Sequence, residues 1–251
     1  MFTLRGNKLL AVMTVVGVSG ALLAGCGDDG NDSGGSEKPF SGESADQIAA
    51  KAVAATKKAK SLHVKGDTRQ SDGKTLTLDL SVDKQKNCDG TVQIQGSRAD
   101  VRHIGDTFYL RGDEQYWKTA LKSQPGAAKA IPKLQDKWAK MPADDAVTKG
   151  LCDKQDLIGA MDSDKSARKS MKKGGTTTVD GQEAIELTKK SSAGETQKLY
   201  VATEGEPYIL RATAEGGKRP STTTFSDYDK EVRPEKPSAG DTVDPRQLAK
   251  S

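Results

Sequence analysis

The stretch KTLTLDLSVD, residues 74–83, decides the fold. Every second position in it is apolar and the positions between are polar; the apolar residues are Leu76, Leu78, Leu80 and Val82. Successive side chains of a strand point to opposite faces of a sheet, so this alternation predicts a strand with one buried and one solvated face. Such strands are typical of antiparallel sheets.

The same alternation continues after this strand. Beyond a turn expected at 87–90, it resumes in segments that carry Val92, Ile94, Val101, Ile104, Phe108 and Leu110, the last two after a tight turn at Gly105-Asp106. These segments predict a meander of four or more strands.

A helix is expected before the strands, from Ser44 to about Ser61. Ser44 and Gln47 have the spacing of a capping box, in which each side chain satisfies a backbone N–H of the other residue. Apolar residues then recur at helical spacing, and lysines fall in the last turn, where cations suit the helix dipole.

The second half of the chain contains short helical pieces and then further strands. Between about residues 120 and 173, prolines separate helical segments such as 128–139 and 154–161. Strand patterns return at 183–188, 197–202, 208–214 and 222–228. This order predicts an α+β fold: one large curved antiparallel sheet, a half-barrel, with helices packed on its concave face.

The first residues have the layout of a signal peptide, with basic residues up to Lys8 and an apolar stretch to Ala24. The sequence Leu23-Ala24-Gly25-Cys26 that follows resembles the lipobox of bacterial lipoprotein precursors. The resemblance implies cleavage before Cys26 and a lipid on its sulfur, which anchors the chain to the outer face of the cell membrane. A plain secretory signal with an unrelated cysteine is the alternative.

Three regions are therefore expected. Residues 1–25 form the signal peptide, residues 26–43 are the lipidated cysteine and a flexible tether rich in glycine, serine and aspartate, and residues 44–251 form a single domain. No later stretch approaches the roughly 20 apolar residues that a membrane-spanning helix needs.

Two cysteines, Cys88 and Cys152, remain once Cys26 is modified. Disulfides persist in exported proteins, so a bridge between Cys88 and Cys152 is predicted. Two free buried thiols or a metal-binding pair are the alternatives, although neither cysteine has a histidine or an acid at zinc-like spacing.

Composition and motifs argue against several function classes. The chain has 39 basic and 35 acidic residues, and the signal peptide removes two of the basic ones, so the near-neutral mature chain gives no electrostatic case for a nucleic-acid partner. The two histidines, His63 and His103, have no nucleophilic serine motif or free cysteine to work with. We therefore expect no catalytic residues, no metal site and no cofactor, and we do not expect an enzyme.

The layout of the chain also resembles the LppX and LprG type lipoproteins, which belong with LolA and LolB among the half-barrel lipoprotein and lipid carriers. The resemblance rests on the lipobox at Cys26, the short tether, the opening helix followed by Leu62, the alternating strand at 76–82, the hairpin at 108–110 and the closing FSDY at 225–228. It covers roughly residues 45 to 240.

Members of that family hold acyl chains in an apolar cavity between the curved sheet and its helices. The resemblance implies a membrane-anchored lipoprotein that binds acyl chains of a lipid or lipoglycan and carries it within the cell envelope. The expected ligand face consists of Leu76, Leu78, Leu80, Val82, Val92, Ile94, Phe108 and Leu110. The alternative is a non-carrier sensor or accessory lipoprotein of the same fold, which acts through a membrane or envelope protein partner and fills its interior with its own side chains.

Overall fold

The structure, a computed structural model, describes residues 39–69, 73–122, 124–143, 150–162, 169–192 and 194–248. The predicted signal peptide, Cys26 and the tether up to residue 38 lie outside the described residues. The last part of the expected tether is a turn of the domain itself. The N–H of Glu43 donates to the carbonyl oxygen of Phe40 at 3.2 Å, and the Phe40 ring packs against the core.

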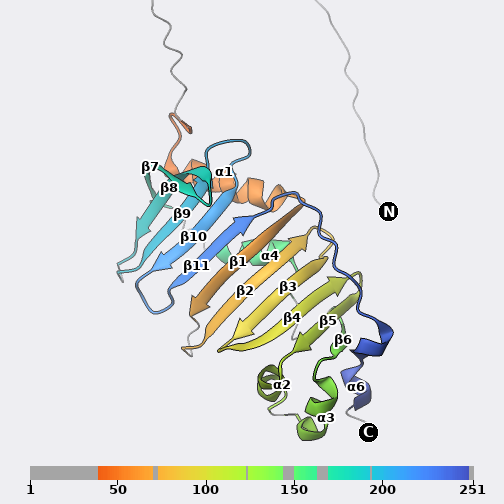
Figure 1. The fold of residues 1–251 in the computed structure, drawn as a ribbon. Coiled ribbons are helices and arrows are strands. Elements are labelled where there is room, and N and C mark those ends of the chain that lie inside the picture. Colours follow the sequence, from red (N-terminus) through yellow and green to blue (C-terminus); the bar gives the residue numbers. More distant parts are fainter. Residues whose placement is uncertain are drawn as a thin grey trace, which may run out of the picture. The chain divides into compact units, whose positions relative to one another are not determined.

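The described residues form one twelve-stranded sheet with the order β12-β6-β5-β4-β3-β2-β1-β11-β10-β9-β8-β7 (Figure 1). The strands are β1 (Ser61–Arg69), β2 (Thr75–Asp83), β3 (Cys88–Ile94), β4 (Ser97–Ile104), β5 (Thr107–Gly112), β6 (Trp138–Pro142), β7 (Lys172–Val179), β8 (Gln182–Lys190), β9 (Thr196–Ala202), β10 (Ile209–Glu215), β11 (Ser221–Ser226) and β12 (Thr242–Val243). Strand β1 lies in the middle because β2 and β11 pair with its two sides, which joins the two halves of the chain.

The large sheet with helices is confirmed, and it is mixed because the two-residue edge strand β12 is parallel to its neighbour. β12 runs parallel to β6, with Thr242 opposite Trp138, whereas the other neighbouring strands of the described sheet run antiparallel. A long connection rather than a hairpin leads from β11 to β12, and only such a connection allows β12 to enter beside β6 in the same direction.

The helices are α1 (Ala45–Lys58), α2 (Glu114–Ala120), α3 (Ala127–Leu134), α4 (Lys154–Asp162) and α6 (Pro245–Leu248), with a 3₁₀ turn at Ala239–Asp241. Helix α1 begins as predicted: Ser44 and Gln47 form the complete capping box. Helices α1 and α4 lie behind the sheet in Figure 1, on its concave face, which we call the inner face. Helices α2, α3 and α6 lie at the end of the sheet near β5 and β6 (Figure 1).

Apolar side chains fill the inner face over the first half of the sheet. The strand registers place the following residues in one continuous row across six strands: Leu110, Val101, Gly90, Leu80, Val64 and Phe225. The apolar side chains of this row are buried. Only glycine fits at position 90, because a Cβ there would lie 2.0 Å from the carbonyl oxygen of Asp79 and the backbone φ is +153°. This half of the sheet has a packed core.

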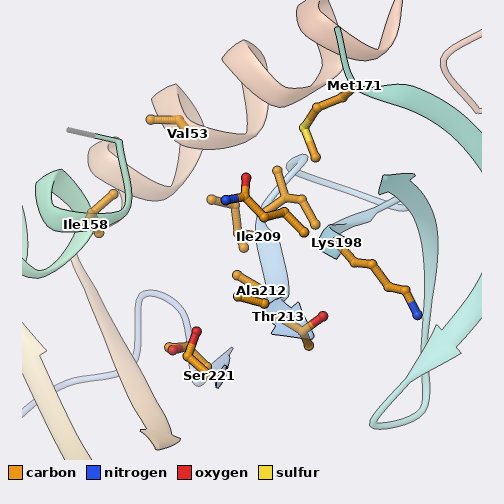
Figure 2. Close-up of a pocket in the computed structure, with 12 residues that line it drawn as sticks. Val53, Ile158, Met171, Lys198, Ile209, Ala212, Thr213 and Ser221 are labelled. Atoms are coloured by element: carbon orange, nitrogen blue, oxygen red, sulfur yellow. The ribbon is translucent and has the colours of Figure 1, made fainter. Parts of the chain in front are cut away.

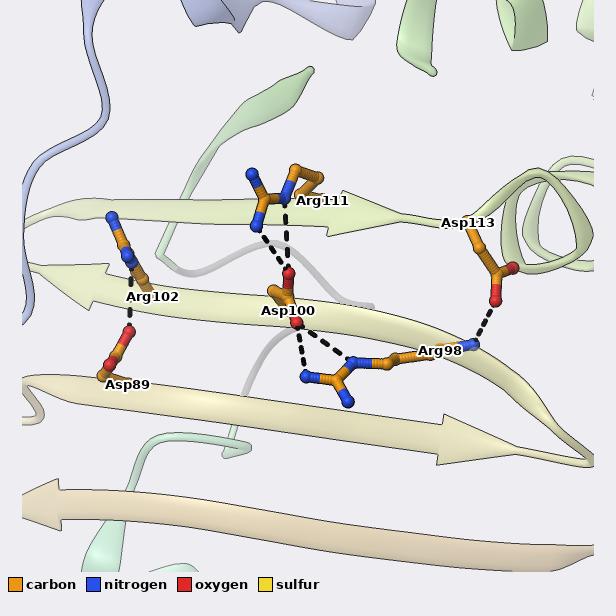
Figure 3. A network of polar contacts seen from close by, with 6 residues as sticks. All are labelled: Asp89, Arg98, Asp100, Arg102, Arg111 and Asp113. Atoms are coloured by element: carbon orange, nitrogen blue, oxygen red, sulfur yellow. Dashed lines mark hydrogen bonds and ion pairs between the residues drawn. The ribbon is translucent and has the colours of Figure 1, made fainter. Parts of the chain in front are cut away.

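The outer face of the same strands is polar. Asp100 of β4 pairs with Arg98 at 3.1 Å and with Arg111 of β5 at 2.8 Å, and Arg102 pairs with Asp89 at 3.0 Å (Figure 3). The guanidinium groups of Arg102 and Arg111 each lie 4.7 Å from the ring centre of Trp138. An apolar ligand has no complementary surface there, so the inner face is the place to look for one.

Candidate functional site: an apolar hollow on the inner face

The inner face carries a hollow of about 210 Å³ over the second half of the sheet (Figure 2). Val53 of α1 and Ile158 of α4 cover it from one side. Its floor and rim consist of Met171, Gln197, Leu199, Ile209, Ala212, Ala214, Ser221 and Thr223. Lys198 and Thr213 also border this space, but Figure 2 shows the Lys198 side chain extending away from it. We call this space the inner hollow.

Small side chains create the inner hollow. Register places Ala212 of β10 between Leu199 and Thr223, and Ala214 between Gln197 and Ser221. In the first half of the sheet, the corresponding space under the helices is filled by leucine, valine and phenylalanine side chains. Alanine and serine do not reach α1, so apolar wall atoms are left without partners.

The polarity of the inner hollow changes along β10. Val53, Ile158 and Ile209 are buried and apolar at one end. Towards the other end the lining becomes Ala214, Ser221 and Gln197, which are half-buried. The site therefore suits a molecule with an apolar part inside and a more polar part at the rim.

Three consecutive residues hold α4 over the inner hollow. Cys152 forms a disulfide with Cys88 of β3, with a Cα–Cα distance of 5.5 Å. The carboxylate of Asp153 accepts the N–H of Gln155 at 2.9 Å and pairs with the Lys86 ammonium at 2.9 Å. Burial alone raises the pKa of Asp153, but these hydrogen bonds outweigh it and leave the pKa below its ordinary value.

The third of these residues, Lys154, is a buried cation. Its side chain is 1 % exposed, and its ammonium donates to the carbonyl oxygen of Lys57 at 2.7 Å. Burial and the neighbouring charge of Lys84 lower the pKa of Lys154. On the other side, the N–H of Ile209 donates to the Thr56 hydroxyl at 3.1 Å. The last turn of α1 is thereby tied to both α4 and β10.

The strand registers place the sequence-predicted ligand residues on the inner face, in three different environments. Leu80, Val82, Val92, Phe108 and Leu110 are buried in the packed core. Leu76 and Leu78 line a smaller hollow of about 50 Å³, which shares Thr223 with the inner hollow. Ile94 is half-buried opposite Leu76.

Sequence reasoning assigned no site residues to β9, β10 or β11, where the inner hollow lies. The available signal was the run of small residues at inward positions, Ala212 and Ala214 on β10 and Ser221 and Thr223 on β11. Inward positions occupied by small residues mark where a sheet cannot fill the space beneath its helices.

Two further hollows in the described residues are lined by charged groups. One of about 360 Å³ lies beside His103, Asp106 and Asp156, and one of about 250 Å³ lies beside Lys60, Asp83 and Asp229. Neither offers the apolar walls that an acyl chain requires. Among the described residues, no group of three or more histidine, cysteine or acidic side chains is arranged to hold a metal ion.

No protein-family model matches the sequence, and no curated protein sequence matches it. Solved structures do match. LprF from Mycobacterium bovis is 13 % identical, with 78 % of this chain and 97 % of LprF covered and a TM-score of 0.51. The Mycobacterium tuberculosis lipoprotein LppX is 16 % identical, with 75 % and 97 % covered and a TM-score of 0.48.

The similarity to LprF extends over most of both chains, and at this identity it establishes the fold. No helix among the described residues combines the length and the apolarity needed to cross a membrane. The similarity to LprF and the sheet topology together show the LppX/LolA-like half-barrel fold, an open mixed sheet with helices on its concave face.

Proposed function

We propose that this protein is a lipoprotein that binds an acyl chain of a lipid or lipoglycan in the inner hollow and carries it within the cell envelope. The proposal includes an anchor on Cys26 at the outer face of the bacterial cell membrane. The observation that carries it is the inner hollow itself, which is lined by the apolar side chains of Val53, Ile158 and Ile209 and by small residues of β10 and β11.

The energetics support an acyl chain as the occupant. Each methylene removed from water contributes about 0.8 kcal/mol, so several methylenes supply a substantial driving force before ordering costs. The volume of about 210 Å³ is below the range of roughly 300–1,000 Å³ that is usual for sites that enclose a whole small molecule. The inner hollow therefore takes part of one chain, and the remainder of the ligand stays outside.

This function requires binding and release, and we propose no catalytic reaction for the protein. The residues that line the inner hollow are aliphatic, small or neutral polar apart from Lys198, whose side chain extends away from it. Such a lining can orient and shield an acyl chain, which is what a carrier needs.

A sensor or accessory lipoprotein that acts through an envelope protein partner is the second candidate. The packed row from Leu110 to Phe225 favours it, because half of the inner face is filled by the protein's own side chains. The two candidates differ in whether lipid occupies the inner hollow.

The test measures how much non-covalently bound acyl lipid each protein molecule carries after the full chain has been purified from membranes. Ala212→Trp places a large ring in the inner hollow, and Thr222→Trp places the same ring at an exposed position on the opposite face of β11. We expect bound acyl lipid in the unmodified protein and in Thr222→Trp, and a loss of most of it in Ala212→Trp. A protein with the original sequence that carries no non-covalently bound acyl lipid supports the second candidate and contradicts the first.

A further inference from the structure

The inner hollow has a neighbour on the same face of the sheet. The smaller hollow of about 50 Å³, which we call the small hollow, is bordered by residues of β1 and β2, among them Gly66, Leu76 and Leu78. Thr223 of β11 borders both hollows. The two spaces therefore meet at the Thr223 side chain.

Strand register shows how the two hollows are joined. Four directly opposite residues form one row across β10, β11, β1 and β2: Ala212, Thr223, Gly66 and Leu78. Directly opposite residues of neighbouring strands point to the same face of a sheet. The row begins in the inner hollow and ends in the small hollow.

The side chains at the join between the hollows are small. Gly66 has no side chain, and a Cβ there would lie 2.9 Å from the Thr223 hydroxyl oxygen, so only glycine leaves room for this threonine. One step along the same strands, Phe225 lies opposite Val64, and both are buried in the packed core. A ligand chain can therefore lie against the sheet at Thr223 and Gly66, whereas Phe225 and Val64 fill the corresponding space.

The small hollow offers apolar surface that the protein itself leaves partly uncovered. Its walls are almost entirely apolar. Leu76 and Leu78 are half-buried, and so is Ile94 of β3, which lies opposite Leu76. The one charged residue in this lining, Asp67, is exposed and pairs in register with the exposed Thr222, so its side chain points to the outer face.

These leucines gain more from a ligand than the far wall of the inner hollow does. Val53, Ile158 and Ile209 are already buried by contacts within the protein, with exposed fractions of 8 %, 1 % and 1 %. The hydrophobic driving force is roughly proportional to the apolar area that is removed from water. The end of an acyl chain is therefore stabilised more at Leu76 and Leu78 than deeper under α1.

The row also has the length of one acyl chain. Ala212 and Leu78 are three strands apart, which corresponds to about 14 Å because neighbouring strands lie about 4.8 Å from each other. The hydrocarbon core of a bilayer is about 30 Å thick and contains two layers of chains, so one membrane acyl chain spans about 15 Å.

We infer that the acyl chain lies across the strands, over Thr223 and Gly66, and that its methyl end occupies the small hollow beside Leu76 and Leu78. Its polar end then lies at the rim of the inner hollow near Ala214 and Gln197. This inference rests on the proposed function, because it assigns a second subsite to the same ligand. Thr223 thereby becomes the residue that determines how much of the chain the protein can cover.

The experiment locates the two ends of the chain. Two photoreactive monostearoylglycerols carry a diazirine either beside the terminal methyl group or beside the ester. Each is added to the full lipidated chain in phosphatidylcholine vesicles, and the labelled peptides are identified by mass. We expect the methyl-end probe to label Thr75–Asp83 of β2 and the ester-end probe to label Thr196–Ala202 of β9 or Ile209–Glu215 of β10.

Thr223→Phe should block the join between the hollows. It should reduce labelling of β2 by the methyl-end probe about tenfold, which is the factor expected when about two methylenes lose their apolar contacts. Labelling of β9 and β10 by the ester-end probe should persist. The matched control is Thr222→Phe, which places the same ring at an exposed position on the outer face of β11 and should change neither.

Labelling of α1 or α4 instead of β2 by the methyl-end probe overturns the inference and leaves the proposed function standing. Equal effects of Thr223→Phe and Thr222→Phe on the labelling of β2 also overturn it. The positions labelled in the protein with the original sequence decide the matter even if Thr223→Phe does not fold. Labelling of neither hollow by either probe overturns the proposed function itself.

Discussion

The ammonium of Lys154 lies 2.7 Å from the carbonyl oxygen of Lys57, in the last turn of α1. Carbonyl groups in the last turn of a helix have no partner within the helix, and a cation there also suits the helix dipole. Lys154 opens α4, and the Gln155 amide donates to the same carbonyl oxygen at 3.1 Å, so the first turn of α4 is joined to the end of α1, and these two helices cover the inner hollow. The architecture of the site therefore depends on the short segment Cys152-Asp153-Lys154.

Asp153→Ala should loosen α4 in a pH-dependent way. The side chain of Asp153 satisfies backbone N–H groups in the first turn of α4, and losing such a cap costs about 1 kcal/mol of unfolding free energy at neutral pH. The pKa of Asp153 is lower in the folded than in the unfolded protein, so its stabilisation is present above the unfolded value of 3.8 and is lost as the pH falls through the folded value.

Denaturant unfolding at pH 7 and at decreasing pH checks this prediction. The difference between the unmodified protein and Asp153→Ala should shrink below about pH 4. Asp153→Asn is the control, because asparagine caps helices as well as aspartate does, and it should retain most of the stability at pH 7. A difference for Asp153→Ala that stays constant down to pH 2 would show that the carboxylate charge is irrelevant.

The bridge between Cys88 and Cys152 should be present in the exported protein and should stabilise it. The two residues are 64 positions apart, and closing a loop of that size contributes about 4 kcal/mol in the chain-entropy model. Intact mass after thiol alkylation, with and without reduction, measures the bridge, and melting of Cys88→Ala/Cys152→Ala measures its effect. Alkylation of both cysteines in the unreduced folded protein would refute the bridge.

Tryptophan substitutions should distinguish the packed half of the inner face from the hollow half. Leu80 has no exposed surface and lies between Val64 and Gly90, so Leu80→Trp should overpack the core and cost roughly 1–3 kcal/mol. Ala212→Trp extends into the inner hollow and should cost clearly less. Thermal melting of the two variants checks the order. Equal destabilisation would mean that the inner hollow is not available space.

Cys26→Ala should prevent lipid modification of the chain. Metabolic labelling with radioactive fatty acid, followed by isolation of the protein, measures the modification directly. We expect radioactive label in the protein that retains Cys26 and none in Cys26→Ala, because the thioether to the lipid requires the Cys26 sulfur. Label retained by Cys26→Ala would place the lipid elsewhere.

Much of the fold could be predicted from local patterns. The capping box of Ser44 and Gln47 marked the start of α1, and the alternation at 76–82 marked β2, because each signal depends on neighbours in the sequence. The LppX/LolA-like half-barrel was expected from the layout and is confirmed. The strands predicted at 183–188 and 197–202 agree within two residues with β8 and β9.

The strands that local sequence patterns did not predict form through contacts with residues far away in the sequence. β1 carries Gly66 at an inward position, where a Cβ would lie 2.7 Å from the carbonyl oxygen of Thr222 on β11, so its alternation is interrupted by a long-range contact. β7, an edge strand, is exposed along most of its length and has little apolar pattern. The predicted helix at 128–139 ends at Leu134, and Trp138–Pro142 is instead a strand beside β5.

The turn expected at 87–90 was also misplaced, since β3 already begins at Cys88. The inner hollow could not be located from local patterns, because its volume depends on side-chain sizes on β9, β10 and β11 taken together with the position of α1. Alternation predicts which side chains point inward but does not predict whether they fill the space.

Native mass spectrometry of the full chain, ejected directly from membrane vesicles, tests the central claim most directly. We predict a population whose mass exceeds that of the lipidated protein by the mass of one acyl lipid, which dissociates on collisional activation. Ala212→Trp should lack this population and Thr222→Trp should keep it. A single mass for the unmodified protein, with no dissociable acyl lipid, would contradict the claim that the inner hollow binds one.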